Sequence, residues 1–506
     1  MRRTLTSIVA LGMAGSLLLA GCGSDAGSQE QKSTVLTVGA AQGIGKLNPA
    51  ESGTAWELVL FPLLYDGLVK IGQTGELQPD LATKWTASED SKDWTFDLRS
   101  GVKFSNGKAL TAQDVVDSFK YYMDPDTPTQ FKNNLAPITK VTADSDSKVT
   151  FSLKGANALF PTTIDSIKIL YMDSMSSIDQ TPVVTGPYKV EKFVANDTLS
   201  LVRNPEYFGE KQGADKINLV TASDSSAAIT GLQSGDLDSV WSIPLSQVKT
   251  LEANKDFGIV KPSVIGQYVS WEVDTTSPPF DDVRARQALS YAIDRDAILQ
   301  NAYYGVGTTS ATNNPIADNS KDFASGLTDY TYDIAKAKAL FTEAGIKSGS
   351  TLTWYGVSNQ YPEWNTSAQI LQASLAKIDI KLDIKNVDIA SWPEKFYPAG
   401  KKFPNMIIPN FQSYQPVPSD LFQFLRNGRC ECNWNNAEFD SLYNKALATP
   451  DADRDQVWAQ MQKLVNTDVP TLVPVQFATV TATGQGVTGV WVDGTGTPHY
   501  EAAVVK

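Results

Sequence analysis

The sequence predicts a mixed α/β fold, and three features of the chain indicate it. Short runs rich in β-branched and aromatic residues alternate with segments of helical periodicity along the 506 residues. Apolar residues make up 42% of the chain and charged residues 20%, which is typical of a globular protein with large cores. No internal repeat is visible, so a solenoid is excluded, and the length leaves room for roughly two or three domains.

The expected elements follow from these local patterns. The β-rich runs predict strands at residues 34–40, 94–98, 148–153, 199–203, 269–273, 352–355 and 380–387. Helical periodicity predicts helices at residues 111–123, 283–302, 333–344, 366–377, 436–448 and 451–466. Thr111 and Asp114 have the spacing of a capping box at a helix start, and Gly345 follows the 333–344 helix as a C-cap glycine does.

Residues 1–22 have the layout of an export signal. Arg2 and Arg3 precede an apolar run at residues 8–20 that is too short to span a bilayer. The Leu-Ala-Gly-Cys that ends at Cys22 resembles the lipobox of bacterial lipoproteins, in which this cysteine is lipidated and becomes the mature N-terminus. We expect a signal peptide at residues 1–21 and a flexible tether at residues 22–33. The alternative is an ordinary signal peptide with a chance cysteine.

Composition and charge exclude several classes of function. Because residues 1–21 carry two arginines and no acid, cleavage changes the formal charge from −13 to −15, which repels nucleic acid. His499 is the only histidine and there are three cysteines, so zinc sites built from several imidazoles or four thiolates are excluded, and no metal or cofactor is expected. His499 also has no apparent partner to orient it as a catalytic base, and we expect it at a strand end or the surface.

Two further motifs have simple interpretations. Residues 484–489 fit the glycine pattern of dinucleotide-binding loops, but a strand and turn are expected to follow rather than the required helix. Cys430 and Cys432 would lie outside the reducing cytoplasm, where a disulfide between them is favoured. Two separate thiols are the alternative, because such a bridge closes a very short loop.

From about residue 47 to 480, the order of motifs resembles the extracellular solute-binding proteins of ABC importers, family 5. The resemblance rests on "FPLLYDGLVK" (61–70), "LQPDLATKW" (77–85), "TGPYKV" (185–190) and above all "PPFDDVRARQALSYAIDRDAI" (278–298). It implies a two-lobed fold of the periplasmic-binding-protein type (class II, cluster C) with an extra inserted domain. Lobe I would comprise residues 34–70, 183–263 and 480–506, the inserted domain residues 71–182, and lobe II residues 264–479.

The resemblance also implies where a ligand would bind between the lobes. The expected contacts are Gly53, Thr54, Ala55, Trp56, Phe131, Trp271, Trp392, Phe411 and Tyr414. Trp392 and Phe411 match ligand-contacting aromatics of the family. Tyr414 stands where the peptide binders of the family have an aspartate for the peptide's α-ammonium, and a buried ammonium without a carboxylate is costly.

Three functions remain open from the sequence. The first is an oligopeptide- or dipeptide-binding lipoprotein, anchored through Cys22 to the outer face of the cytoplasmic membrane, acting as a monomer with the permease and ATPase subunits of an ABC importer. The second is an oligosaccharide receptor, which Tyr414 and the supply of tryptophans favour, since a neutral sugar needs stacking but no counter-ion. The third, a surface hydrolase, is disfavoured by the missing histidines. Nickel or haem as cargo is disfavoured for the same reason.

Overall fold

The computed structural model describes residues 34–51, 55–210, 212–357, 361–396, 400–426, 429–449 and 451–506. Residues 34–506 form one compact unit. Within the described ranges, no helix is both long enough and apolar enough to cross a bilayer. The expected signal peptide, Cys22 and the tether lie outside the described residues.

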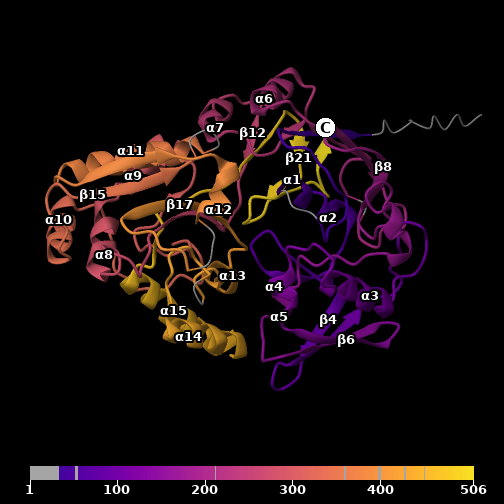
Figure 1. The fold of residues 1–506 in the computed structure, drawn as a ribbon. Coiled ribbons are helices and arrows are strands. Elements are labelled where there is room, and N and C mark those ends of the chain that lie inside the picture. The colour runs from indigo at the N-terminus through magenta and orange to yellow at the C-terminus, as the bar shows by residue number, and fades with distance from the viewer. Residues whose placement is uncertain are drawn as a thin grey trace, which may run out of the picture. The chain divides into compact units, whose positions relative to one another are not determined.

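The first seven-stranded sheet joins segments from both ends of the chain. Its order is β12 (Gly258–Val260), β20 (Thr481–Thr483), β11 (Ser239–Val240), β1 (Val35–Ala40), β10 (Lys216–Thr221), β9 (Thr198–Arg203) and β8 (Tyr188–Val194). The central strand β1 runs parallel to β10 and to β11. In Figure 1 the yellow C-terminal strands lie beside the magenta β12, which agrees with the antiparallel pairing of β12 and β20.

A second seven-stranded sheet is built from the later half of the chain. Its order is β14 (Thr308–Thr309), β19 (Val475–Gln476), β13 (Gln267–Glu272), β17 (Met406–Ser413), β15 (Thr351–Gly356) and β16 (Lys381–Asn386), with β18 (Thr471–Leu472) also paired to β13. All six residues of β13 are buried, as expected of a central strand covered on both faces. The helices packed around this sheet include α8 (Val283–Ala292), α9 (Arg295–Asn301), α10 (Ile334–Glu343) and α11 (Pro362–Ala376).

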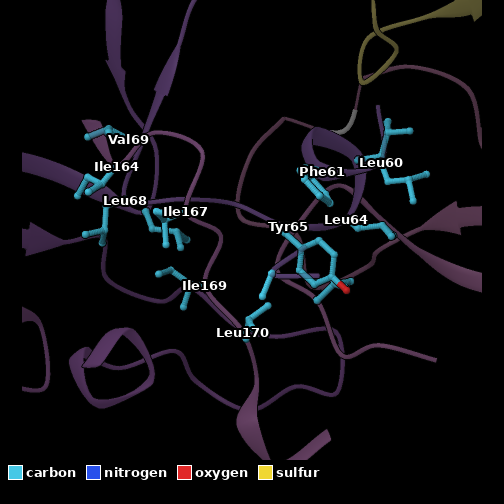
Figure 2. Packing of buried hydrophobic residues seen from close by; sticks show 14 of the residues in the cluster. Leu60, Phe61, Leu64, Tyr65, Leu68, Val69, Ile164, Ile167, Ile169 and Leu170 are labelled. Atoms are coloured by element: carbon cyan, nitrogen blue, oxygen red, sulfur yellow. The ribbon is translucent and has the colours of Figure 1, made fainter. Parts of the chain in front are cut away.

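A smaller four-stranded antiparallel sheet has the order β4 (Ala82–Ala87), β5 (Asp93–Leu98), β7 (Lys148–Leu153) and β6 (Ile138–Ser145). Helix α3 (Ala112–Met123) covers it, and its core is continuous with that of the first sheet. Figure 2 shows part of this shared core around Leu64, Tyr65 and Leu68. The strands of the first sheet lie within residues 34–70, 183–263 and 480–506, those of the second within residues 264–479 and those of the small sheet within residues 71–182, and the division into lobes stays a prediction.

The remaining elements connect these sheets. They are α1 (Ala55–Leu58), α2 (Phe61–Leu64), β2 (Val69–Ile71), β3 (Leu77–Pro79), α4 (Lys132–Leu135), α5 (Phe160–Thr163), η1 (Met172–Ser177), α6 (Ser225–Ser234), α7 (Leu245–Glu252), η2 (Ile389–Ser391), α12 (Trp392–Phe396), α13 (Pro418–Gln423), α14 (Ala437–Ala448), α15 (Asp451–Asp468), β21 (Val487–Thr488), β22 (Trp491–Val492), β23 (Pro498–His499) and β24 (Val504–Val505). No helix follows residues 484–489; β21 lies within them and β22 follows, so the strand-and-turn interpretation is confirmed.

Local capping chemistry explains several element boundaries. The backbone N–H and the hydroxyl of Thr111 both donate to Asp114 Oδ2 at 2.8 Å, so the predicted capping box at the start of α3 is confirmed. The prediction of one helix over 283–302 is wrong, because Asp294 ends α8 and caps α9 by accepting the N–H of Ala297 at 3.0 Å. The helix expected from 366 begins at Pro362, since proline is favoured in the first helical turn.

Candidate functional site

A cavity of about 1240 Å³ is lined by strands β13 and β17 of the second sheet and by connecting segments that leave the first sheet and the small four-stranded sheet. Trp241 follows β11 of the first sheet, Phe411 lies in β17 of the second, and Phe131 precedes α4 beside the third. Ligand pockets of this size are usually lined by aromatic and apolar side chains with a few placed polar groups. The lining here has that composition, and it also carries charged groups of both signs.

One wall of the cavity is aromatic. Phe411 is 37% exposed, and its ring centroid lies 5.4 Å from that of Phe477, which also lines the cavity. Tyr361 and Trp364 line it from α11 and its N-terminal flank, with their rings stacked 4.2 Å apart. The exposed part of the Phe411 ring is apolar surface that a ligand can cover, and full burial of such a side chain is worth about 1.5–3 kcal/mol.

Two of the expected tryptophans lie one layer behind this lining. Trp56 is fully buried and stacks at 5.2 Å and 12° on Trp241, which lines the cavity and donates from Nε1 to the Gly496 carbonyl at 3.0 Å. Trp392 is 2% exposed and packs 5.6 Å from Trp364. Neither Trp56 nor Trp392 is among the lining residues of the cavity.

The other expected contacts are divided between cavity and core. Phe131 and Phe411 line the cavity. Trp271 is buried in the second sheet with its ring edge against Trp354, and Tyr414 is half-buried and stacked on Phe424 at 6.4 Å; neither lines the cavity. Ala55 begins α1, whereas Gly53 and Thr54 lie outside the described residues. The roles of these residues as ligand contacts stay predictions.

The single histidine has two carboxylate partners that the sequence did not reveal. His499 Nδ1 lies 3.0 Å from Glu501 Oε1, and Nε2 lies 3.3 Å from Asp493 Oδ2, with the imidazole stacked on Trp491 at 3.7 Å. Burial alone would lower the pKa of His499, but Glu501 and Asp493 outweigh it and raise the pKa to about 9. The one signal in the sequence is that Glu501 lies only two residues after His499.

Further carboxyl groups line the same part of the cavity. Asp66 and Asp80 are both buried, and burial raises the pKa of each, that of Asp66 to about 8. Burial also raises the pKa of Asp165 to about 6. Across the described ranges, no three histidine, cysteine or acidic side chains converge on a metal position.

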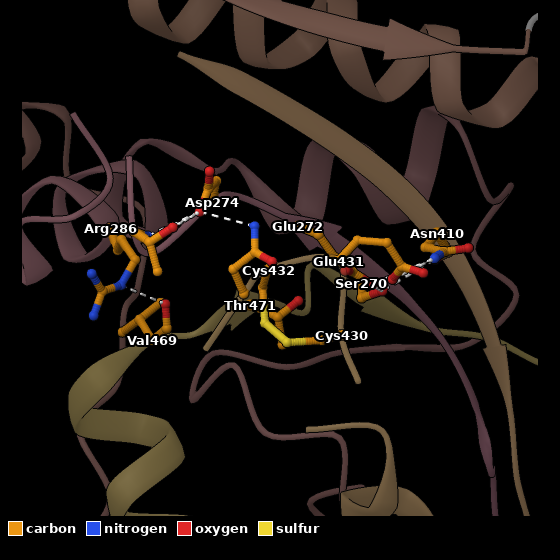
Figure 3. The surroundings of a disulfide bond; sticks show 12 residues. Ser270, Glu272, Asp274, Arg286, Asn410, Cys430, Glu431, Cys432, Val469 and Thr471 are labelled. Carbon is orange, nitrogen blue, oxygen red and sulfur yellow. Dashed lines mark hydrogen bonds between the residues drawn. A yellow bond between two sulfur atoms is a disulfide. The ribbon is translucent and has the colours of Figure 1, made fainter. Parts of the chain in front are cut away.

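Cys430 and Cys432 are joined by a disulfide with a Cα–Cα distance of 5.0 Å. Figure 3 shows Glu431, between them, directed toward Asn410 and Glu272. Asn410 Nδ2 donates to Glu431 at 3.3 Å, and burial together with Glu431 raises the pKa of Glu272 well above its usual range. None of these residues lines the cavity, and the contact of this segment with β17 is made by Glu431.

Comparison with known proteins places the chain in a family. The sequence profile of the bacterial extracellular solute-binding proteins, family 5 Middle, matches residues 76–429. A dipeptide-binding protein of Escherichia coli K12 is 28% identical over 497 residues, covering 90% of this chain and 91% of that one. Heme-binding protein A of Haemophilus influenzae is 27% identical over 455 residues, covering 80% of each chain.

The fold has close matches among solved structures. The ABC transporter substrate-binding protein CtaP of Listeria monocytogenes superposes with a TM-score of 0.84 at 23% identity, covering 94% of this chain and 99% of that one. This likeness confirms the expected two-lobed α/β fold. The relatives are binding proteins rather than enzymes. Since the family profile matches most of the sequence, the chain belongs to the bacterial extracellular solute-binding proteins of family 5.

Proposed function

We propose that this protein captures short peptides outside the cytoplasm and delivers them to the permease of an ABC importer. The observation that carries the proposal is the cavity of about 1240 Å³, which combines an aromatic wall with charged groups of both signs. A zwitterionic peptide presents apolar side chains, backbone amides and two opposite charges, and each has a complementary surface in this cavity. The name of the Escherichia coli dipeptide-binding relative supports the same ligand class.

An oligosaccharide is the second candidate. The exposed face of Phe411 and the lining ring of Trp241 offer stacking surfaces for sugar rings. A neutral sugar, however, brings no cation to pair with the buried carboxyls of Asp66 and Asp80 when they ionise, whereas a peptide brings an ammonium group. The charged part of the cavity therefore favours the peptide.

Haem and nickel are less suited to the cavity. An imidazole ligand from the protein to either metal would have to come from His499, because the chain has no other histidine. Both ring nitrogens of His499 already contact carboxylate oxygens, at 3.0 and 3.3 Å, so neither is free to bind a metal without breaking the pair.

Transport follows from binding without covalent chemistry. In the proposed mechanism, ligand bound between the lobes stabilises the closed form, and the permease and ATPase subunits recognise that form. Each protein molecule carries one ligand and acts as a monomer.

Mass spectrometry of ligand released from natively purified protein tests the ligand class. Denaturing the protein in acetonitrile should release peptides of a few residues. Recovery of hexose oligomers in stoichiometric amount would instead show that the ligand is an oligosaccharide. Binding of Ala-Phe by isothermal titration calorimetry gives an independent measurement on ligand-free protein.

We further propose that Cys22 is lipidated and anchors the protein to the outer face of the cytoplasmic membrane. Cys22→Ser should move the protein from the membrane fraction to the soluble fraction, because a single thioether-linked diacylglycerol supplies the attachment. Ser24→Ala, two residues away, leaves the cysteine in place and should stay with the membrane. A Cys22→Ser protein that still sediments with membranes would contradict the anchor.

A further inference from the structure

Asp66 is held in a fixed position at the cavity. Its backbone N–H donates to Thr185 Oγ1 at 3.1 Å, and its carbonyl accepts from the N–H of Ile169 at 3.0 Å. Figure 2 shows the apolar side chains of Tyr65 and Leu68 packed in the core on either side of it in the sequence. The backbone of Asp66 is therefore fixed at the edge of the cavity, and its side chain is buried there.

One oxygen of this carboxyl has no partner. Asp66 is 6% exposed and is among the residues that line the cavity, yet its Oδ2 accepts no hydrogen bond from any residue that the structure describes. A buried polar atom left unpaired costs about 1–3 kcal/mol, and more when it is charged. A ligand that brings proton donors to this oxygen recovers that energy.

The nearest cations of the protein are directed at other groups. Lys70 Nζ lies 3.8 Å from Asp80 Oδ1, and about half of the Lys70 side chain is exposed to solvent. Lys168 Nζ donates to the backbone carbonyl of Asp165 at 3.4 Å. Asp80 adds a second carboxyl, whose repulsion acts on Asp66. Among the described residues, neither lysine forms a salt bridge with the Asp66 carboxyl.

We propose that Asp66 binds the primary ammonium group of the ligand, with Asp80 as a positioning residue that strengthens the negative potential behind it. An ammonium group has three N–H donors and a full positive charge, so it can form the charge-assisted hydrogen bond that Asp66 Oδ2 lacks. A metal ion is the less suitable partner, because no third acidic, cysteine or histidine ligand converges there within the described ranges. This assignment rests on the proposed function in that the ligand is the peptide cargo.

Binding at this carboxyl exchanges a proton for the ligand's cation. Burial, followed by repulsion from Asp80, raises the pKa of Asp66 to about 8, so the empty site holds a proton at pH 7. The charged and titratable groups that face this carboxyl, together with its hydroxyl partner, are Asp80, Lys70, Lys168, Tyr207 and Thr185. When the ammonium arrives, the carboxyl O–H bond breaks, the proton passes to solvent, and the carboxylate pairs with the N–H donors.

Calorimetry on the full-length, ligand-free protein tests this exchange with three probes. Ala-Phe carries a free ammonium, N-acetyl-Ala-Phe is the same peptide without it, and phenethylamine carries an ammonium without a peptide bond. Titrations at pH 7 in phosphate and in Tris, whose ionisation enthalpies differ, give the number of protons released. A carboxyl with a pKa of about 8 that becomes charged in the complex releases about 0.9 proton, and the α-amino group of Ala-Phe, partly neutral at pH 7, takes up about 0.1, so we expect a net release of about 0.8 proton per Ala-Phe bound.

Asp66→Asn is the test variant, because asparagine has the shape of the protonated acid. It should bind Ala-Phe about 30- to 100-fold more weakly than the wild type and release no proton. Asp420→Asn is the matched control, since burial raises the pKa of Asp420 to about 7 although it does not line the cavity, and this variant should behave as wild type. Wild-type protein should likewise bind N-acetyl-Ala-Phe weakly without proton release, which tests the site even where a variant fails to fold.

The outcomes separate this subsite from the proposed function. If Asp66→Asn binds Ala-Phe with wild-type affinity and proton release, the ammonium subsite is overturned while peptide binding stands. If the wild type binds phenethylamine with proton release at Asp66 but binds no Ala-Phe, the subsite stands and the peptide function fails. Binding of none of the probes overturns both.

Discussion

His499 is expected to titrate far above the ordinary range of a histidine and to make the stability of the protein depend on pH. Its side chain is 12% exposed, and the Glu501 and Asp493 carboxylates lie at its two ring nitrogens. They raise its pKa from 6.5 to about 9 against the opposing effect of burial. That difference corresponds to about 3 kcal/mol of stabilisation by the protonated ring.

The sign of the pH dependence follows from the raised pKa. Because the folded-state pKa exceeds the unfolded value, the stabilisation is fully present below pH 6.5 and is lost as pH rises through about 9. The free energy of unfolding of the wild type should therefore approach that of His499→Gln, which cannot become charged, as pH is raised. When the free energy of unfolding of the variant is subtracted from that of the wild type, the contributions of other groups that titrate in this range cancel.

The measurement is direct, since the chain contains one histidine. Protein labelled with ¹⁵N-histidine gives the ring signals of a single residue, and their titration by NMR should have its midpoint near pH 9. Urea unfolding of wild type and His499→Gln at pH 6 and pH 10 gives the energetic difference. A midpoint at or below pH 6.5, or a difference that does not change with pH, would refute the reasoning.

Two further predictions concern binding and capping. Phe411→Ala should weaken Ala-Phe binding about 10-fold with little change in stability, whereas Trp392→Ala should lower the free energy of unfolding by about 3–5 kcal/mol, because Phe411 is 37% exposed and Trp392 only 2%. Calorimetry and urea unfolding distinguish the two, and the reverse pattern would contradict the placement of the rings. Thr111→Ala should cost about 1 kcal/mol through loss of the capping box. Gln113→Ala on the exposed face of α3 is its control in thermal unfolding, and equal losses would exclude the cap.

The aromatic residues show how far sequence could predict the site. Phe131 and Phe411 were expected at the ligand and do line the cavity, but Trp56 and Trp392 lie behind Trp241 and Trp364. All four residues are tryptophans, so the residue type does not distinguish those that line the cavity from those behind them. Which of two packed rings faces the cavity depends on the packing between segments far apart in the chain, such as α1 against the loop after β11, and no local pattern encodes that.

The charged residues were harder to predict than the aromatic ones. Asp66 lies in the motif FPLLYDGLVK and Asp80 in the motif LQPDLATKW. The residues next to each aspartate predict only a turn or a strand end. Their burial and mutual repulsion exist only once the segment 164–170 covers Asp66, since the hydrogen bond from Ile169 and the apolar packing come from there. A raised pKa is a property of the folded surroundings rather than of the residue.

The sequence by itself determined the elements, the capping box of α3, the strand and turn after residue 484, and the family, because these depend on neighbouring residues and on their order. The break between α8 and α9 could have been predicted from the sequence, because aspartate is a favoured N-cap residue and Asp294 caps α9. Only the tertiary structure decided which carboxyls are buried together, which rings face the cavity, and that His499 lies between two carboxylates. Those features arise from contacts between distant segments, and burial and electrostatic interaction act through space rather than along the chain.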